Sequence, residues 1–294
     1  MTWALLALLT ALCETGRDLA TRHLLRPGGL SARLVMGLTC VLVALAATPV
    51  AVLLAPPPRW SQLLSSLAAT AVVNGVAFWA YGRSLARGDL SLVLPLINLS
   101  PVVLLLSGWL LVGERPSPAA VLGVLLVVAG ALQLGRGAAA AGPRGALGLW
   151  HRPGVRPMLL VAVLWGIGAG IDKLGVLAGG TLAWVAGLHL VVGLPLLSLA
   201  LATGEGRQLR AVEAPRHRWR WLLLVALLAL TGTGLQMEAL RRTAVVHVIA
   251  IKRLSTLLGA LVGVVWLGEP SGSLRLPGAL LMLAGALLVL ASAR

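Results

Sequence analysis

Long apolar segments alternate with short polar connections along the whole chain. Ten such segments lie at about 2–21, 33–54, 61–82, 90–112, 117–135, 158–177, 181–203, 219–240, 243–267 and 276–292. Most of them run for roughly 19–24 residues, and a helix of about 20 apolar residues spans the hydrocarbon core of a bilayer. The pattern therefore predicts an all-α polytopic membrane protein with ten transmembrane helices.

The two halves of the chain repeat each other. The Gly-Glu pair that ends at Glu114 recurs at Glu269, an offset of 155 residues. At this offset Gly108, Gly123, Gly130, Ser100 and Arg87 meet Gly263, Gly278, Gly285, Ser255 and Arg242. We therefore divide the chain into a first five-helix repeat (1–135), a linker rich in Gly, Ala and Pro (136–157) and a second five-helix repeat (158–294).

An odd number of spans per repeat makes the two repeats enter the membrane from opposite sides. The sequence therefore predicts inverted repeats, which in transporters hold the substrate near the bilayer midplane at the interface between the repeats. At the offset of 155 residues Asn98 falls opposite Arg253, and with one residue of slippage Asp18 meets Asp172. These polar positions are candidates for such a site.

The segment 243–267 carries two adjacent positive charges, Lys252 and Arg253. In a continuous helix they would lie roughly 13–15 Å deep, where a charge costs at least about 2.5 kcal/mol and usually faces a bundle interior or a wet cavity. Small residues follow Lys252 at helical spacing: Ser255, Thr256, Gly259 and Gly263. They predict a small, polar stripe that other helices approach closely.

An ammonium beside a guanidinium offers complementary donors to a phosphate or carboxylate, so the pair predicts an anion-binding site. The alternative is a structural pair neutralised by buried carboxylates elsewhere in the bundle. We also predict that Asn98, Asp172 and Lys173 bind substrate. Asn98 lies between two prolines that interrupt its span, and such breaks survive in membranes where they line a cavity or neighbours satisfy them.

Three carboxylates are candidates for carrying a coupling proton: Glu14, Asp18 and Glu238. Glu14 and Asp18 share a helix face with Arg17, whose charge would simply neutralise one of them in the alternative interpretation. Arg241 and Arg242 follow Glu238 at i+3 and i+4, a spacing that is also typical of an ion pair at a helix end.

Other residues favour structural roles. Glu114 and Glu269 precede the fifth and tenth segments, where a carboxylate stabilises a helix N-terminus. GxxxG motifs occur at Gly166 and Gly170 and at Gly259 and Gly263. They predict close helix packing within the bundle, and they leave a homodimer open.

Composition narrows the function classes. Hydrophobic residues make up 59% of the chain, charged residues make up 11%, and the formal net charge is +15. The basic residues are scattered over short connections, which indicates loops beside the lipid bilayer and no nucleic-acid partner. The sequence has no P-loop, GxSxG or HExxH motif, and His189 and His247 are isolated. We therefore expect no enzyme activity, no cofactor and no metal site.

The repeat is strongest between residues 81–132 and 247–290, which carry LVGE at 111–114 and WLGE at 266–269. These stretches resemble the two EamA repeats of the drug/metabolite transporter superfamily, and the likeness covers nearly the whole chain. The resemblance implies ten helices, a central cavity and alternating access. The Lys252–Arg253 pair also resembles the Lys-Arg pair of plastid phosphate translocators, a branch of the superfamily that carries phosphorylated sugars.

We expect a multi-pass secondary active transporter of the cell membrane that moves a small anionic or zwitterionic metabolite bound by Lys252 and Arg253. Two alternatives stay open: a flippase for a lipid-linked phosphate, and a non-transporting membrane scaffold or intramembrane enzyme. The arginines of the connections place both termini outside by the positive-inside rule. The superfamily that the chain resembles usually has both termini in the cytoplasm, so the orientation is left open.

Overall fold

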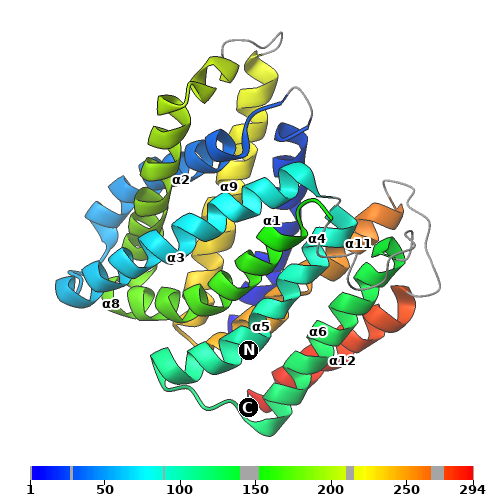
Figure 1. Ribbon diagram of the computed structural model, residues 1–294. Helices are drawn as coiled ribbons and strands as arrows, with labels where there is room; N and C mark the ends of the chain where they lie inside the picture. The colour runs from blue at the N-terminus through cyan, green and yellow to red at the C-terminus, as the bar shows by residue number, and fades with distance from the viewer. Residues whose placement is uncertain are drawn as a thin grey trace.

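The computed structural model describes residues 2–26, 29–88, 90–139, 152–209, 215–265 and 275–293. Within these ranges every regular element is a helix, and the helices gather into one bundle (Figure 1). Most of the linker expected at 136–157 and the carboxylate of Glu269 lie outside the described residues.

Helices occupy the apolar segments that the sequence predicted. The first half contains α1 (Thr2–Leu24), α2 (Ala32–Leu54), α3 (Trp60–Arg87), α4 (Leu90–Leu96), η1 (Ile97–Leu99), α5 (Ser100–Ser107), η2 (Gly108–Val112) and α6 (Pro118–Ala139). The second half contains α8 (Val155–Ala202), η3 (Glu205–Leu209), α9 (Pro215–Leu240), α10 (Val245–Lys252), α11 (Ser255–Val265) and α12 (Arg275–Ser292).

Five helical runs in the described chain are long and apolar enough to cross a membrane. They are Ala32–Leu54, Trp60–Arg87, Val93–Val112, Val155–Ala202 and Arg218–Leu240. Two shorter apolar helices, Pro118–Gln133 and Leu276–Ser292, accompany them. The protein is therefore all-helical and has the helices of an integral membrane protein.

The long helix α8 joins two of the predicted segments, 158–177 and 181–203. Gly180 lies between them with φ 75° and ψ 171°, a conformation that glycine adopts far more readily than other residues. The second part of α8 packs closely on α2: a Cβ added at Gly37 would lie 2.6 Å from the Leu197 nitrogen, and one added at Gly193 would lie 2.7 Å from Cys40 Cβ. The break at Gly180 thus turns one helical run into two segments.

Equivalent helices of the two repeats pack against each other. α6 and α12 lie side by side (Figure 1), and glycines bring their backbones into contact. A Cβ added at Gly130 would lie 2.5 Å from the Gly278 carbonyl oxygen, and one added at Gly285 would lie 2.5 Å from that of Gly123. The two contacts exchange under the 155-residue offset and run in opposite directions along the helices, as inverted repeats require.

The segment 243–267 is not the continuous helix that we predicted. α10 ends at Lys252 and α11 begins at Ser255, and between them the Leu254 nitrogen donates to the Ile251 carbonyl oxygen at 3.0 Å in a tight turn. The small residues that follow Lys252 therefore do not continue the helix face on which Lys252 lies. Among the described residues, a Cβ added at Gly259 would meet no atom within 4 Å, so the close helix approach predicted there is wrong.

The first repeat has a matching break. In the span predicted at 90–112, α4 gives way to the 3₁₀ turn η1 before α5 begins at Ser100. η1 covers residues 97–99, and the 155-residue offset carries these positions onto 252–254, the end of α10. The two interrupted helices contact each other at their breaks, where Asn98 donates to Thr256 and Arg253 donates to Ser100.

Candidate functional site

A group of charged side chains lies at the centre of the bundle. This central charged cluster consists of Glu14, Arg17 and Asp18 on α1, Asp172 on α8, and Lys252 and Arg253 at the end of α10. All of them except Arg17 are at most 9% exposed. The helical spacing of four residues places Glu14 and Asp18 on one face of α1, so that both carboxylates point into the bundle.

Lys252 is paired with a carboxylate and an amide. Its Nζ lies 3.0 Å from Glu14 Oε1 and donates a 2.8 Å hydrogen bond to Gln236 Oε1 on α9. Ser255 Oγ, at the start of α11, donates to the other oxygen of Glu14 at 3.3 Å. A buried charge is tolerated when it is paired and hydrogen-bonded in this way, and Glu14 is a buried carboxylate of the kind that the structural alternative requires beside Lys252.

Arg17 links the two carboxylates of α1. Its Nη2 lies 3.2 Å from Glu14 Oε1 and 3.2 Å from Asp18 Oδ1. Asp18 also accepts a hydrogen bond from the hydroxyl of Tyr81 on α3. Glu14, Arg17, Asp18 and Lys252 therefore form one continuous network of opposite charges.

Arg253 and Asp172 differ from the rest of the cluster. Arg253 donates through Nη2 to Ser100 Oγ at 2.6 Å, its buried Nε has no hydrogen-bond partner, and it forms no ion pair within the described chain. Asp172 also forms no ion pair within these residues, and its buried Oδ1 accepts no hydrogen bond. Because a buried charge without an ion pair is costly, these two groups are the candidates in the cluster for binding a charged ligand.

A polar cavity opens beside the central charged cluster. Charged and amide side chains line much of it: Glu14, Arg17, Asn74, Asp172, Gln236, Lys252 and Arg253. These residues come from α1, α3, α8, α9 and the end of α10, so both repeats contribute. The cavity is therefore a polar space to which both repeats contribute side chains.

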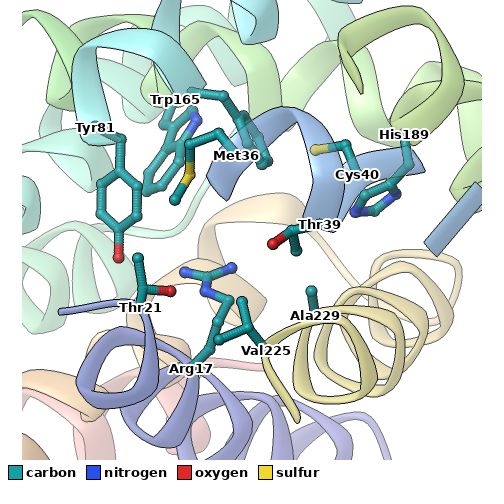
Figure 2. Close-up of a pocket in the computed structure, with 11 residues that line it drawn as sticks. Arg17, Thr21, Met36, Thr39, Cys40, Tyr81, Trp165, His189, Val225 and Ala229 are labelled. Atoms are coloured by element: carbon teal, nitrogen blue, oxygen red, sulfur yellow. The ribbon is translucent and has the colours of Figure 1, made fainter. Parts of the chain in front are cut away.

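A second, more apolar cavity adjoins the first. Arg17, Phe78 and Trp165 line both cavities. Figure 2 shows the Arg17 side chain reaching into this second cavity, with Tyr81 and Trp165 facing it. Its remaining walls are formed by Thr21, Met36, Thr39, Cys40, His189, Val225 and Ala229.

Aromatic rings gather where the two cavities meet. The Trp165 ring centroid lies 5.0 Å from that of Tyr81 and 5.9 Å from that of Phe78, and Lys252 Nζ lies 6.0 Å from the Trp165 centroid. The chain contains a single Tyr and a single Phe, and both are in this group. The sequence analysis missed these residues, although their rarity in an otherwise aliphatic chain was a usable signal.

Lys173, which we predicted to bind substrate, is absent from the side chains that line the polar cavity. Its Nζ lies 2.5 Å from Glu114 Oε1 and donates to the Thr243 carbonyl oxygen at 2.8 Å. Glu114 Oε2 accepts a 2.8 Å hydrogen bond from the Val245 nitrogen. Glu114 therefore stabilises the N-terminus of α10 in the other repeat, in addition to preceding α6 as the sequence indicated.

Asn98 also lies outside the cavity lining. Its Nδ2 donates to Thr256 Oγ1 at 2.7 Å and to the Pro95 carbonyl oxygen at 3.2 Å. The amide thus satisfies a carbonyl near a proline and connects η1 to α11. The structure places Asn98 at a contact between the two interrupted helices.

Glu238 lies near the end of α9, with 29% of its side chain exposed. Arg241 Nη1 lies 3.2 Å and Arg242 Nη2 lies 2.8 Å from its carboxylate, and Thr181 Oγ1 donates to it at 2.9 Å. Arg242 also donates to Thr2 Oγ1. The structure thus places Glu238 in a network at the end of a helix, away from the central charged cluster.

Comparisons with known proteins agree with the repeat and the fold. A family model described as EamA-like transporter family matches residues 1–136 and 152–291. No curated protein matches the chain. Among solved structures, one titled only "Crystal structure of protein" matches with a TM-score of 0.73 and 20% identity over 99% of this chain and 98% of that chain. At this identity the likeness shows the fold alone.

Proposed function

This chain belongs to the EamA-like transporter family, and on that premise we propose that it is a secondary active transporter of a small anionic or zwitterionic metabolite. Members of this family are membrane transporters of the drug/metabolite transporter superfamily. In the proposed arrangement α8 supplies two spans, α4 to η2 supply one, and α10 with α11 supply another. This arrangement gives ten spans in two inverted repeats of five.

The proposal depends most on Arg253. Its guanidinium is 3% exposed, lines a cavity between the repeats, and forms no ion pair within the described chain. An ion inside a membrane protein usually serves the passage of a substrate or ion, and a guanidinium matches the planar geometry of a carboxylate or phosphate. We assign the negative group of the substrate to Arg253, with Lys252 held beside it by Glu14.

Inverted repeats provide the movement. Both repeats contribute side chains to the polar cavity, so rocking one repeat against the other would expose Arg253 to each side of the membrane in turn. In this scheme the contacts between the interrupted helices, from Asn98 to Thr256 and from Arg253 to Ser100, connect the two repeats beside the site. Lys173 would help to hold α10 in place through Glu114.

Coupling to protons is a further part of the proposal. Glu14 and Asp18 each form an ion pair with a cation in the central charged cluster, so protonation of either carboxylate would weaken that ion pair. If one of them carries the driving proton, its neutralisation should abolish accumulation against a gradient and spare the exchange of substrate. Uptake driven by a pH gradient in proteoliposomes, compared with exchange, measures this for Glu14→Gln and Asp18→Asn.

The test of the anion site begins with thermal unfolding of the purified protein in the presence of organic acids, phosphorylated sugars, amino acids and lipid phosphates. A ligand that binds only the folded protein raises its stability. For the ligand found, Arg253→Gln should weaken binding by roughly 10- to 150-fold, because a charge-assisted contact contributes about 1.5–3 kcal/mol. Arg253→Lys should also weaken it, because an ammonium lacks the planar fork.

Arg241→Gln is the matched control, because Arg241 is a half-exposed arginine that contacts only Glu238 among the described residues. This variant should bind the ligand and transport it as the wild type does. Wild-type affinity in folded Arg253→Gln protein would move the anion site elsewhere. Selective transport of cations by the wild type would count equally against the proposal.

A further inference from the structure

Three polar side chains meet at the second cavity, the more apolar of the two. Figure 2 shows the Arg17 guanidinium, the Thr39 hydroxyl and the His189 ring around one space. Arg17 lies on α1, Thr39 on α2 and His189 on α8, so both repeats contribute a polar group. The cavity therefore brings polar groups of three helices together in the interior of the bundle.

The Thr39 hydroxyl is buried without a partner. Thr39 is 6% exposed, and its Oγ1 makes no hydrogen bond within the described residues. A helical threonine can donate to the carbonyl oxygen four residues earlier, as Thr10 and Thr15 of α1 do. Thr39 makes no such bond, and its hydroxyl is directed into the cavity (Figure 2). Because an unpartnered buried hydroxyl is costly, this group points to a hydrogen-bonding ligand in the cavity.

Arg17 and His189 supply a donor and an acceptor beside this hydroxyl. Arg17 binds its carboxylates through Nε and Nη2, which leaves Nη1 outside these bonds. His189 is 2% exposed, and its Nδ1 lies 2.8 Å from the Val185 carbonyl oxygen. Because a carbonyl oxygen only accepts, Nδ1 carries the hydrogen of the neutral ring, and Nε2 is then an acceptor. The cavity thus offers a donor, an acceptor and a hydroxyl that can act as either.

We propose that the second cavity binds ordered water that bridges Arg17, Thr39 and His189. A buried water molecule typically makes about three hydrogen bonds to groups that lack other partners. The free space in this cavity is that of about one or two water molecules. The number of polar groups and the size of the space therefore both match buried water.

Water fits these groups better than other small ligands do. A cation would lie against the positive charge of Arg17, which lines the cavity. An anion would find this guanidinium already held by two carboxylates, Glu14 and Asp18. An apolar occupant would leave the Thr39 hydroxyl without a partner. Water is neutral and both donates and accepts, so it satisfies all three groups.

The proposed water extends the network of the central charged cluster. Arg17 holds Glu14 and Asp18 on one side, and the water connects the same guanidinium to α2 and α8 on the other. It thereby joins the first repeat to the second beside the charged groups. This inference depends on the second cavity alone and is independent of what the protein transports.

Radiolytic labelling of the purified protein in detergent, read by mass spectrometry, detects such water directly. Irradiated water produces hydroxyl radicals that oxidise the side chains touching it, including side chains that bulk solvent does not reach. Met36 and Cys40 line the cavity and are 5% and 1% exposed, so both should be oxidised. Met158 and Met282 are the matched controls: they are fully buried and line neither cavity, so they should stay unlabelled.

Thr39→Val removes the hydroxyl and nearly keeps the shape of the side chain, so the sign of its effect separates a hydrated cavity from a dry one. With water bound, the equilibrium constant for unfolding in a denaturant titration should rise roughly 2- to 12-fold, because a hydrogen bond is lost. Labelling of Met36 and Cys40 should fall in the same variant. In a dry cavity the variant removes an unpartnered hydroxyl, so stability should stay the same or rise. Thr39→Ser retains the hydroxyl and should keep the labelling of the wild type.

The results decide the matter in each case. Labelling of Met36 and Cys40 in the wild type that is as low as that of Met158 overturns the proposal, and this result needs no variant. Unchanged labelling in folded Thr39→Val, or a variant at least as stable as the wild type, also overturns it. Neither measurement involves transport, so the outcome is separate from that of the anion site at Arg253.

Discussion

The two interrupted helices of the bundle occupy equivalent places in the two repeats but carry different chemistry. In the first repeat, Asn98 in η1 donates to Thr256 Oγ1 at 2.7 Å in the second repeat. In the second repeat, Arg253 donates to Ser100 Oγ at 2.6 Å in the first repeat. Asn98 and Arg253 are related by the 155-residue offset, so each break reaches across to a hydroxyl just beyond the other break.

The difference lies in charge. The first break presents a neutral amide whose Nδ2 donates to groups within the protein, whereas the second presents two cations, of which only Lys252 is paired with a carboxylate in the described chain. The duplicated backbone therefore builds the break twice, and only the break of the second repeat carries charged side chains. The same holds for the related pair of aspartates: Asp18 contacts Arg17 and Tyr81, while Asp172 forms no ion pair in this part of the chain.

The largest expected effect tests whether the second break depends on a carboxylate from the first repeat. Glu14→Gln should destabilise the protein by about 3–5 kcal/mol, because it leaves the buried Lys252 ammonium with amide partners only. Thermal unfolding in detergent or nanodiscs measures the loss. The double variant Glu14→Gln/Lys252→Met should be more stable than Glu14→Gln, because it removes the uncompensated charge together with its partner. A double variant less stable than Glu14→Gln would contradict this account.

The repeated frame could be predicted from the sequence, because apolar length and a regular offset determine it. The apolar segments correspond to helices, and the glycine matches at positions 123, 130, 278 and 285 lie where α6 and α12 touch. The break after Lys252 could not be predicted in the same way. The first break has prolines beside it, but no proline interrupts the segment around Lys252, so nothing local marked it.

The site was predictable only in part. Lys252, Arg253 and Asp172 were correctly expected to be buried within the bundle, because isolated charges in apolar segments are visible in the sequence. The contact between Glu14 and Lys252 joins residues far apart in the chain, and helical spacing along one segment carries no information about it. Glycine motifs have the same limit: a Cβ at Gly166 would clash with Val103 and Ser100 on α5, whereas one at Gly259 meets no described neighbour.

The second prediction uses the symmetry of the frame. Gly130→Ala and Gly285→Ala should each cost about 1–3 kcal/mol, because each new methyl group would lie 2.5 Å from a carbonyl oxygen of the partner helix. Since the two glycines are equivalent under the offset, the two losses should be similar. Gly75→Ala is the control: a Cβ there meets no described atom within 4 Å, so the variant should be neutral or more stable by up to about 1 kcal/mol. Unequal losses at Gly130 and Gly285 would weaken the comparison of the repeats.

The third prediction asks whether the first break serves structure alone. Thr256→Val removes the hydroxyl that accepts the Asn98 amide, and it should cost about 0.5–1.5 kcal/mol, the usual net value of one neutral hydrogen bond. Asn98 keeps its contact with the Pro95 carbonyl oxygen in this variant. The affinity for the substrate should stay close to that of the wild type, in contrast to the loss expected for Arg253→Gln. A comparable loss of affinity in Thr256→Val would bring Asn98 back into the binding site.

The smallest effect is expected at Glu238, a carboxylate at the end of α9 that belongs to neither break. Its side chain is 29% exposed, and ion pairs in such positions contribute about 0–1 kcal/mol, so Glu238→Gln should change stability by no more than that. Because Glu238 contacts Arg241, Arg242 and Thr181 outside the polar cavity, uptake driven by a pH gradient should persist in the variant. If this uptake were lost while exchange of substrate remained, Glu238 would be the proton carrier, and the driving carboxylate would lie at the end of α9 and not beside Lys252.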